Sequence, residues 1–285
     1  GDAHLFDMPL SVGGRFSLWS AASVSVACAI GPERLKAFRA GARTMDLHVQ
    51  NTDLSTNLAA QLALLDYWNT NIQGHSQRVV LAYARRLRML PTYLQQLEME
   101  SNGKSVSPAG DVIEDATAPA LWGGEGSIGQ HSYHQWLHQG TQIVPTEFIL
   151  PFADGGDPAG KLALSAHALA QAEVLANGRS LDEVISEEPG IDPATAAQKV
   201  HAGERPSTFF VHDSFGPEAM GALVALYEHR TYLAGMLWGV NPFDQWGVER
   251  GKTMAGRLKP VLSGDAVADD PVTAALAGRV RGALG

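Results

Sequence analysis

The segment best suited to chemistry is FDQWGVERGK, residues 243–252, which places an amide, a carboxylate and an ammonium along one short stretch. Asp244 is a favourable N-cap, so we expect a helix to begin there. On that helix Gln245 and Glu249 lie one turn apart, and Lys252 follows on the same side. Such a face suits a polyhydroxylated, anionic small molecule, with Glu249 orienting the lysine. A solvated helix face with one ion pair accounts for the same spacing.

A second candidate is GGRFS, residues 13–17, in which two glycines precede Arg15. Glycine lets the backbone approach a ligand closely, and a helix that follows offers its amides to an anion. Arg15 would then act as a fixed donor to a developing oxyanion. A glycine turn followed by an incidental arginine is the alternative interpretation.

Two carboxylates, Glu98 and Glu100, stand near the end of a predicted helix, just before the turn at 101–103. A carboxylate at a helix end can reach into a cleft, and partial desolvation there suits a general base. Glu100 is placed for that role. An acidic surface turn is the competing explanation.

Three histidines follow a glycine-rich stretch, and His131, His134 and His138 would share one side of a predicted helix. Zinc is disfavoured, because there is no HExxH pattern and no evident fourth ligand. His131, at the expected helix start, is placed to shuttle a proton. We expect His134 and His138 to be structural and hydrogen-bonded. The chain has no P-loop, no GxGxxG after a strand and no GxSxG elbow, which argues against nucleotide-dependent and serine-hydrolase chemistry.

Composition narrows the class of protein. The 285 residues are 45% hydrophobic and 18% charged, enough for a sizeable core in one or two domains. The net charge of -9 argues against nucleic acid as a partner. A single cysteine, Cys28, excludes a disulfide framework and favours a reducing cytoplasm. We expect Ser17–Ile30 to form a buried helix with Cys28 in the core. That run lacks a basic leader and is too short to span a membrane.

The elements that must position these residues can be read from apolar periodicity. The predicted helices are 32–50, 57–72, 91–99, 161–176 and 217–238. The predicted strands are 77–83, 143–150 and 207–212. Strands that alternate with helices indicate an α/β fold, with a parallel sheet between two helical layers. Loops rich in Gly, Pro and acidic residues are expected at 154–158 and 187–193.

These segments, in this order, resemble the phosphoglucose isomerase family. FDQWGVERGK matches one family signature at every constrained position, and VGGRFSLWSA is similar to the core of the other. MESNGK, GQHSYHQ, HQGT and GALVALYEH add to the likeness, which extends from about Phe6 to Leu262. Two positions depart from the family pattern, since Leu10 and Ile128 stand where the family usually has polar residues.

The resemblance implies a role for each candidate residue. Glu100 corresponds to the base that moves a proton between adjacent carbons through a cis-enediol. Arg15, with Gly14, corresponds to the element that stabilises the enediolate. His131 and Lys252 correspond to the groups that open the sugar ring.

Two glutamines, Gln96 and Gln245, match positions that contact the substrate, including its phosphate. The implied reaction interconverts glucose 6-phosphate and fructose 6-phosphate, a step of glycolysis and gluconeogenesis. It needs no metal or organic cofactor, because it only moves a proton between neighbouring carbons.

The implied fold is an αβα sandwich with a mainly parallel sheet, the sugar-isomerase (SIS) type of domain. Residues 1–50 correspond to the end of a first such domain, 51–262 to a second and 263–285 to a C-terminal tail that we expect to be helical. The rest of the first domain, with its Ser/Thr-rich loop that binds the sugar phosphate, has no counterpart in this sequence.

In the family the active site lies at a dimer interface and the histidine comes from the neighbouring subunit. The resemblance therefore implies a homodimer in which Glu100 and His131 of one chain serve different sites. Two other hypotheses are open at this point. The chain could be a non-catalytic module that binds sugar phosphates without the phosphate loop, or an inert truncated product that self-associates through an exposed sheet edge.

Overall fold

The computed structural model describes residues 6–152 and 157–284. Its contacts divide the chain into two compact units, Gly1–Pro242 and Phe243–Gly285. The division falls just before FDQWGVERGK, whereas the domain boundaries expected from the resemblance lie after residues 50 and 262. Those boundaries remain a prediction, as contacts within one chain do not test them. The predicted loop at 154–158 falls mainly outside the described residues.

The first unit is built on four parallel strands in the order β2-β1-β3-β4. They are β1 Gln77–Ala82, β2 Ala120–Glu125, β3 Thr146–Pro151 and β4 Ser207–His212. Three of them confirm predicted strands. The fourth, β2, is not predicted because two glycines break its apolar pattern. Gly123 has φ +146°, and a Cβ there would lie 2.0 Å from the carbonyl oxygen of Val80.

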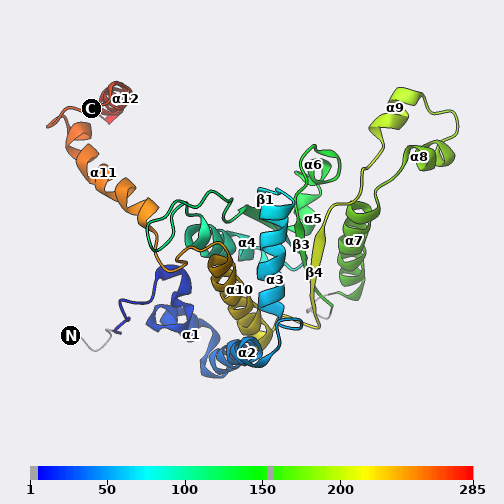
Figure 1. Ribbon diagram of the computed structural model, residues 1–285, viewed down its shortest axis with the longest axis horizontal. Helices are drawn as coiled ribbons and strands as arrows, with labels where there is room; N and C mark the ends of the chain where they lie inside the picture. Colours follow the sequence, from blue (N-terminus) through cyan, green and yellow to red (C-terminus); the bar gives the residue numbers. More distant parts are fainter. Residues whose placement is uncertain (1–5, 153–156, 285) are drawn as a thin grey trace. The chain divides into compact units, whose positions relative to one another are not determined.

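Helices cover both faces of this sheet, which confirms the predicted αβα sandwich (Figure 1). On one face lie α2 Pro32–Asn51, α3 Leu58–Tyr67, α4 Leu90–Leu94 and α10 Pro217–Leu237. On the other lie α5 Gly126–Gly129, α6 His134–Gln139 and α7 Pro158–Asn177. The predicted loop at 187–193 joins α8 Leu181–Glu187 to α9 Pro193–Gln198.

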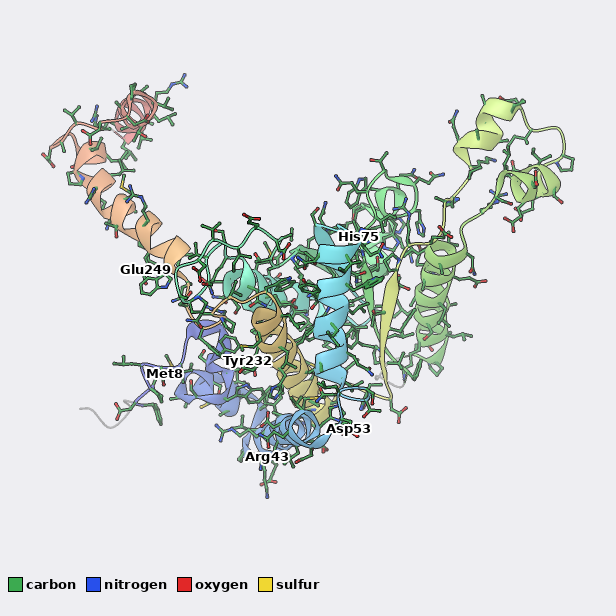
Figure 2. All side chains as sticks on the ribbon, in the orientation of Figure 1. Met8, Arg43, Asp53, His75, Tyr232 and Glu249 are labelled. Atoms are coloured by element: carbon green, nitrogen blue, oxygen red, sulfur yellow. The ribbon has the colours of Figure 1, made fainter. Side chains whose placement is uncertain are left out.

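Strand β1 shows why the core has two halves. Its side chains alternate between faces, so Val80 and Ala82 pack towards α4 and α10 while Val79 and Leu81 pack towards α6 and α7. All four are at most 1% exposed. Side chains fill the space on both sides of the strands (Figure 2). A strand buried on both faces reads as a continuous apolar run, which explains why it could be predicted.

The apolar run 17–30 does not form the expected buried helix. It forms two 3₁₀ turns, Gly14–Trp19 and Ala21–Ser23, followed by α1 Val24–Ile30, in which no residue is buried. Cys28 is exposed, so its assignment to the core is wrong. The helix packs against α2 and the preceding 3₁₀ turn, and Val24 and Val26 on it stay exposed.

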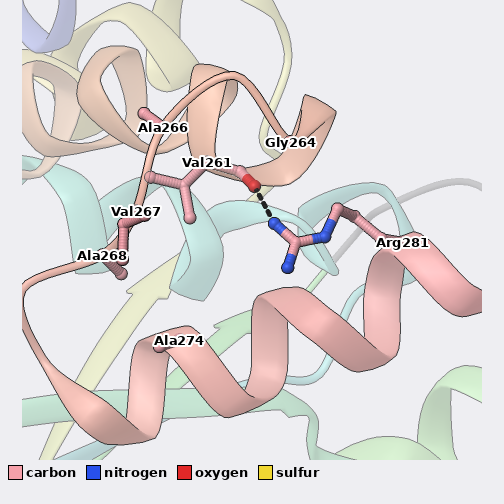
Figure 3. A pocket seen from close by; sticks show the side chains of 7 residues that line it. All are labelled: Val261, Gly264, Ala266, Val267, Ala268, Ala274 and Arg281. Carbon is pink, nitrogen blue, oxygen red and sulfur yellow. Dashed lines mark hydrogen bonds between the residues drawn. The ribbon is translucent and has the colours of Figure 1, made fainter.

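The second unit consists of α11 Trp246–Ser263 and α12 Pro271–Leu284, the latter within the tail expected to be helical. Gly264 ends α11 in the left-handed conformation with φ 93°. Arg281 donates from Nη1 to the carbonyl of Val261 at 2.7 Å, which ties the two helices together (Figure 3). In the described part of the chain, no helix has both the length and the apolarity to cross a bilayer.

A buried charge cluster joins five elements of the first unit: Asp66 on α3, Arg78 on β1, Glu98 after α4, Glu147 on β3 and Arg230 on α10. Arg230 Nη2 lies 2.6 Å from both Asp66 Oδ1 and Glu147 Oε1. Arg78 pairs with Asp66 and Glu98, and its Nε lies 3.3 Å from Glu147. The cluster therefore holds the sheet to the helices on one of its faces.

Three carboxyl groups share two guanidiniums in this cluster, so its charges do not balance. Burial raises the pKa of Glu98 even though Arg78 contacts it. Burial also acts on Asp66, but Arg230 and Arg78 outweigh it and hold the pKa of Asp66 below its ordinary value. The excess negative charge therefore falls most heavily on Glu98, whose ionised form burial disfavours.

Removing one cation tests the cluster. Arg230→Met leaves Asp66 and Glu147 buried without that partner, so we expect the free energy of unfolding to fall by about 3–5 kcal/mol. Urea denaturation followed by circular dichroism measures the change. The control is Arg34→Met on the exposed side of α2, expected within about 0.5 kcal/mol of wild type. Equal effects of the two substitutions would contradict the assigned role.

A second test concerns the crossing of α2 and α10. A Cβ at Gly41 would lie 1.8 Å from the carbonyl oxygen of Glu218, and one at Gly221 would lie 1.8 Å from that of Phe38. Gly221→Ala must therefore push the helices apart, and we expect a loss of roughly 1–3 kcal/mol in the same assay. The matched control, Gly160→Ala on α7, has room for its methyl group and should be neutral or slightly stabilising.

Candidate active site

Arg15 is the centre of the candidate site. Its guanidinium is buried and donates from Nε to Ser101 Oγ at 2.6 Å and from Nη2 to the carbonyl of Pro242 at 2.6 Å. Its Nη1 lies 3.3 Å from Glu100 Oε2. The cation is thus held by these two neutral acceptors and lies beside the carboxylate of Glu100.

Glu100 is positioned by a widened helical turn. Helix α4 continues directly into a π-helical turn, Gln95–Glu100, where the sequence predicts an ordinary helix end. Leu97 and Glu98 face inward from this turn and are buried, so the turn is anchored in the core. The Glu100 side chain stays 24% exposed. Single π turns occur often at functional sites, where they redirect a side chain.

Gln96 completes a group of three predicted site residues. Its Nε2 donates to Glu100 Oε2 at 3.4 Å, from one turn earlier in the same element. The structure thus brings Arg15, Glu100 and Gln96 together from segments far apart in the sequence. A partly open carboxylate beside a buried cation can take up a proton while the cation stabilises a developing negative charge.

Gly14 lies next to this group and is exposed. A Cβ there would meet nothing within 4 Å, and its φ is outside the left-handed range. Neither local packing nor backbone conformation therefore requires glycine. Close approach of a ligand to the backbone is a reason that fits both observations.

Three further residues of the MESNGK segment support the site through hydrogen bonds, and the sequence predicts no separate role for them. Ser101 accepts the hydrogen bond from Arg15, and Asn102 Nδ2 donates to the carbonyl of Thr231 at 2.9 Å. Lys104 donates to the carbonyls of Asn241 and Ser101. Together these contacts attach the turn after Glu100 to the end of the first unit. The motif itself was the signal that could have identified them.

His131 is not at a helix start, contrary to the sequence prediction. It lies in the turn between α5 and α6, and its side chain is exposed. The helix stops after Gly129, where a Cβ would lie 2.6 Å from the hydroxyl of Tyr133. His131 is not among the partners of Arg15 and Glu100 given above.

The other two histidines have the structural role predicted for them. His134 Nδ1 and His138 Nε2 both contact Gln171 Oε1, at 2.9 and 2.6 Å. Burial lowers the pKa of both rings, which favours their neutral forms. The two rings thus share one amide oxygen as a hydrogen-bond partner.

The FDQWGVERGK segment lies in the second unit, and its helix begins one residue later than predicted. Gln245, not Asp244, is the N-cap of α11, with φ -153°, so Gln245 stands outside the helical face expected for it. Glu249 and Lys252 are exposed on the first turns, where Figure 2 labels Glu249. Among the described residues no ion pair between their side chains is found, and an exposed pair of this kind would gain little from a fixed geometry.

Comparison with known proteins identifies the family of this chain. The family model for phosphoglucose isomerase matches residues 1–277. The chain is 48% identical over 278 residues to a glucose-6-phosphate isomerase of Caulobacter sp. (strain K31), covering 95% of this chain and 52% of that protein. It is 45% identical over 281 residues to one of Jannaschia sp. (strain CCS1), with the same two coverages.

A solved structure is similar as well. The crystal structure of a glucose-6-phosphate isomerase from Chlamydia trachomatis superposes with a TM-score of 0.83 at 34% identity, covering 98% of this chain and 52% of that one. The parallel sheet and its helical layers are consistent with a sugar-isomerase type of fold. The chain spans about half the length of the curated relatives it matches. By sequence and by fold, the chain belongs to the phosphoglucose isomerase family.

Proposed function

We propose that this chain provides the proton-transfer centre of an aldose–ketose isomerase that interconverts glucose 6-phosphate and fructose 6-phosphate. The observation that supports this most directly is the pair formed by the buried Arg15 and the partly open Glu100, 3.3 Å apart. The proteins that resemble this chain in sequence and in structure are named glucose-6-phosphate isomerases, which also supports the proposal.

The proposed chemistry needs one base and one cation. Glu100 takes the proton from the carbon next to the carbonyl, and the electron pair moves to form an enediolate. Glu100 then returns the proton to the neighbouring carbon, while the hydroxyl proton passes from the second oxygen to the former carbonyl oxygen, so a new carbonyl forms and no atom or electron is lost. Arg15 stabilises the oxygen that becomes negative between these two steps.

The remaining predicted residues act before and around this step in the proposal. His131 and Lys252 open the sugar ring and handle the ring oxygen. Gln96 and Gln245 contact the substrate and its phosphate, and the backbone of Gly14 lies against the sugar. A single exposed cysteine is compatible with the reducing cytoplasm proposed as its compartment.

The proposed assembly is a homodimer with shared sites. His131 is exposed and lies in the turn between α5 and α6. This turn is separate from the elements that carry Arg15 and Glu100. In this arrangement it reaches the site of a second copy of the chain. Each site then needs Glu100 from one chain and His131 from the other.

Replacing the base tests the chemistry. We expect Glu100→Gln to lower kcat/KM by roughly 10²- to 10⁴-fold, because the amide cannot accept the carbon-bound proton. A coupled assay measures formation of glucose 6-phosphate from fructose 6-phosphate. Glu173→Gln on the exposed side of α7 is the matched control and should keep wild-type activity.

Two outcomes would contradict this assignment in different ways. Equal turnover by wild type and Glu100→Gln would show that Glu100 is not the base. If neither protein turned over while calorimetry showed that both bind fructose 6-phosphate, the chain would act as a binding module rather than as a complete catalyst.

Mixing two inactive variants tests the shared site. Glu100→Gln and His131→Ala are each expected to be inactive as homodimers. In a mixed dimer one site keeps both wild-type residues, so statistical mixing should restore roughly a quarter of wild-type activity. A mixture as inactive as its components would contradict sharing. The Glu173→Gln variant mixed with His131→Ala provides the positive control.

A further inference from the structure

The 3₁₀ turn that carries Arg15 is anchored at its other end by Trp19. The indole Nε1 of Trp19 donates to Glu228 Oε2 on α10 at 2.6 Å. The ring also stacks on Phe38 of α2, with centroids 5.0 Å apart and an interplanar angle of 21°. The N-terminal turn is therefore fastened to the two helices that cross at Gly41 and Gly221.

Glu228 is a largely buried carboxyl group that the proposed reaction does not use. Tyr93 is its second described partner, with the hydroxyl 3.5 Å from Oε1. Burial raises the pKa of Glu228 to about 7, and the negative charge of Asp46 adds to this, while the hydrogen bonds from Trp19 and Tyr93 lower it. Asp46 is itself paired with His229, 2.8 Å away.

The position of Glu228 on α10 links it to the core. Its neighbour Tyr227 donates to Glu147 of the buried charge cluster at 2.9 Å, and Arg230 belongs to that cluster. Because successive helical residues point in different directions, Glu228 points towards the N-terminal turn while these two point towards the sheet. A fixed helix thus presents Glu228 at a fixed place.

We propose that Glu228 is a positioning residue for Arg15, acting through Trp19. The turn Gly14–Trp19 is only six residues long, so holding both of its ends determines where the guanidinium lies. At one end Ser101 and the Pro242 carbonyl accept from Arg15, and at the other Glu228 accepts from Trp19. The functional importance of this placement rests on the role proposed for Arg15.

The anchor depends on pH. The ionised carboxylate accepts a charge-assisted hydrogen bond from the indole, which is stronger than the bond to a neutral carboxyl. The turn is therefore held more tightly above pH 7 than below it. The stability of the whole protein changes with pH in the opposite sense to the strength of this hydrogen bond. Because the pKa is raised from 4.5 to about 7, the free energy of unfolding falls as the pH rises through that interval.

Hydrogen exchange measured by mass spectrometry tests the anchor without requiring turnover. After correction for intrinsic rates, protection of the amides at 14–20 should rise between pH 6 and pH 8 in the wild-type chain. In Glu228→Gln this rise should be absent, and in Glu228→Leu protection should fall roughly ten-fold at pH 8. Trp19→Phe keeps the ring stacking but loses the donor, so it should resemble Glu228→Gln.

Controls identify the titrating group. Peptides from α7 should show no such change, and Glu173→Gln should behave as wild type. His229→Gln should keep the transition, and its loss in that variant would overturn the assignment to Glu228. Persistence of the wild-type transition in Glu228→Gln would overturn it as well.

Kinetics then separate positioning from general stability. Where the chain turns over, Glu228→Gln should lower kcat about 10-fold, leave KM nearly unchanged and flatten the pH profile near 7. An altered exchange pattern with unchanged kinetics would overturn the positioning role. A protein that shows the exchange transition but no turnover would support the anchor and contradict the proposed function.

Discussion

Two buried arginines shared by three carboxyl groups are the interaction on which the first unit depends. Arg78 and Arg230 reach it from β1 and α10, and the carboxyl groups arrive from α3, β3 and the π turn after α4. Each ion has been taken out of water, so each is tolerable only while its partners stay in place. Removing one member leaves a buried charge without its partner, so the five elements depend on one another at this point.

The same cluster reaches the candidate site through one short piece of chain. Glu98 belongs to the cluster and Glu100 to the site, and both lie on the turn Gln95–Glu100. One carboxyl group is fully enclosed while the other remains partly open to solvent. The placement of the proposed base therefore follows from the placement of its buried neighbour, and the two glutamates cannot exchange roles.

Local patterns in the sequence predict much of this structure, but not the features set by tertiary contacts. β1 is a continuous, buried apolar run and α10 is a long, buried helix, so the apolar pattern of the sequence identifies both. β2 escapes prediction because Gly123 serves an approach to Val80 that no local pattern shows. The run 17–30 looks buried because it is apolar, yet burial requires a partner surface. The meeting of Arg15 with Glu100 became predictable through motif resemblance, whereas the hydrogen bonds from Arg15 to Ser101 and to the Pro242 carbonyl needed the structure.

The close contact between α2 and α10 at their glycines also affects the order in which the chain folds. Gly41 and Gly221 meet in space but lie near opposite ends of the first unit in the sequence. The four strands lie between them along the chain, so the helix contact closes a very long loop. Contacts at such sequence separation form late, because the loop entropy must be overcome before they contribute. During synthesis the apolar side of α2 therefore leaves the ribosome long before its partner exists. Until α10 arrives, that apolar surface stays without this partner and is prone to aggregation.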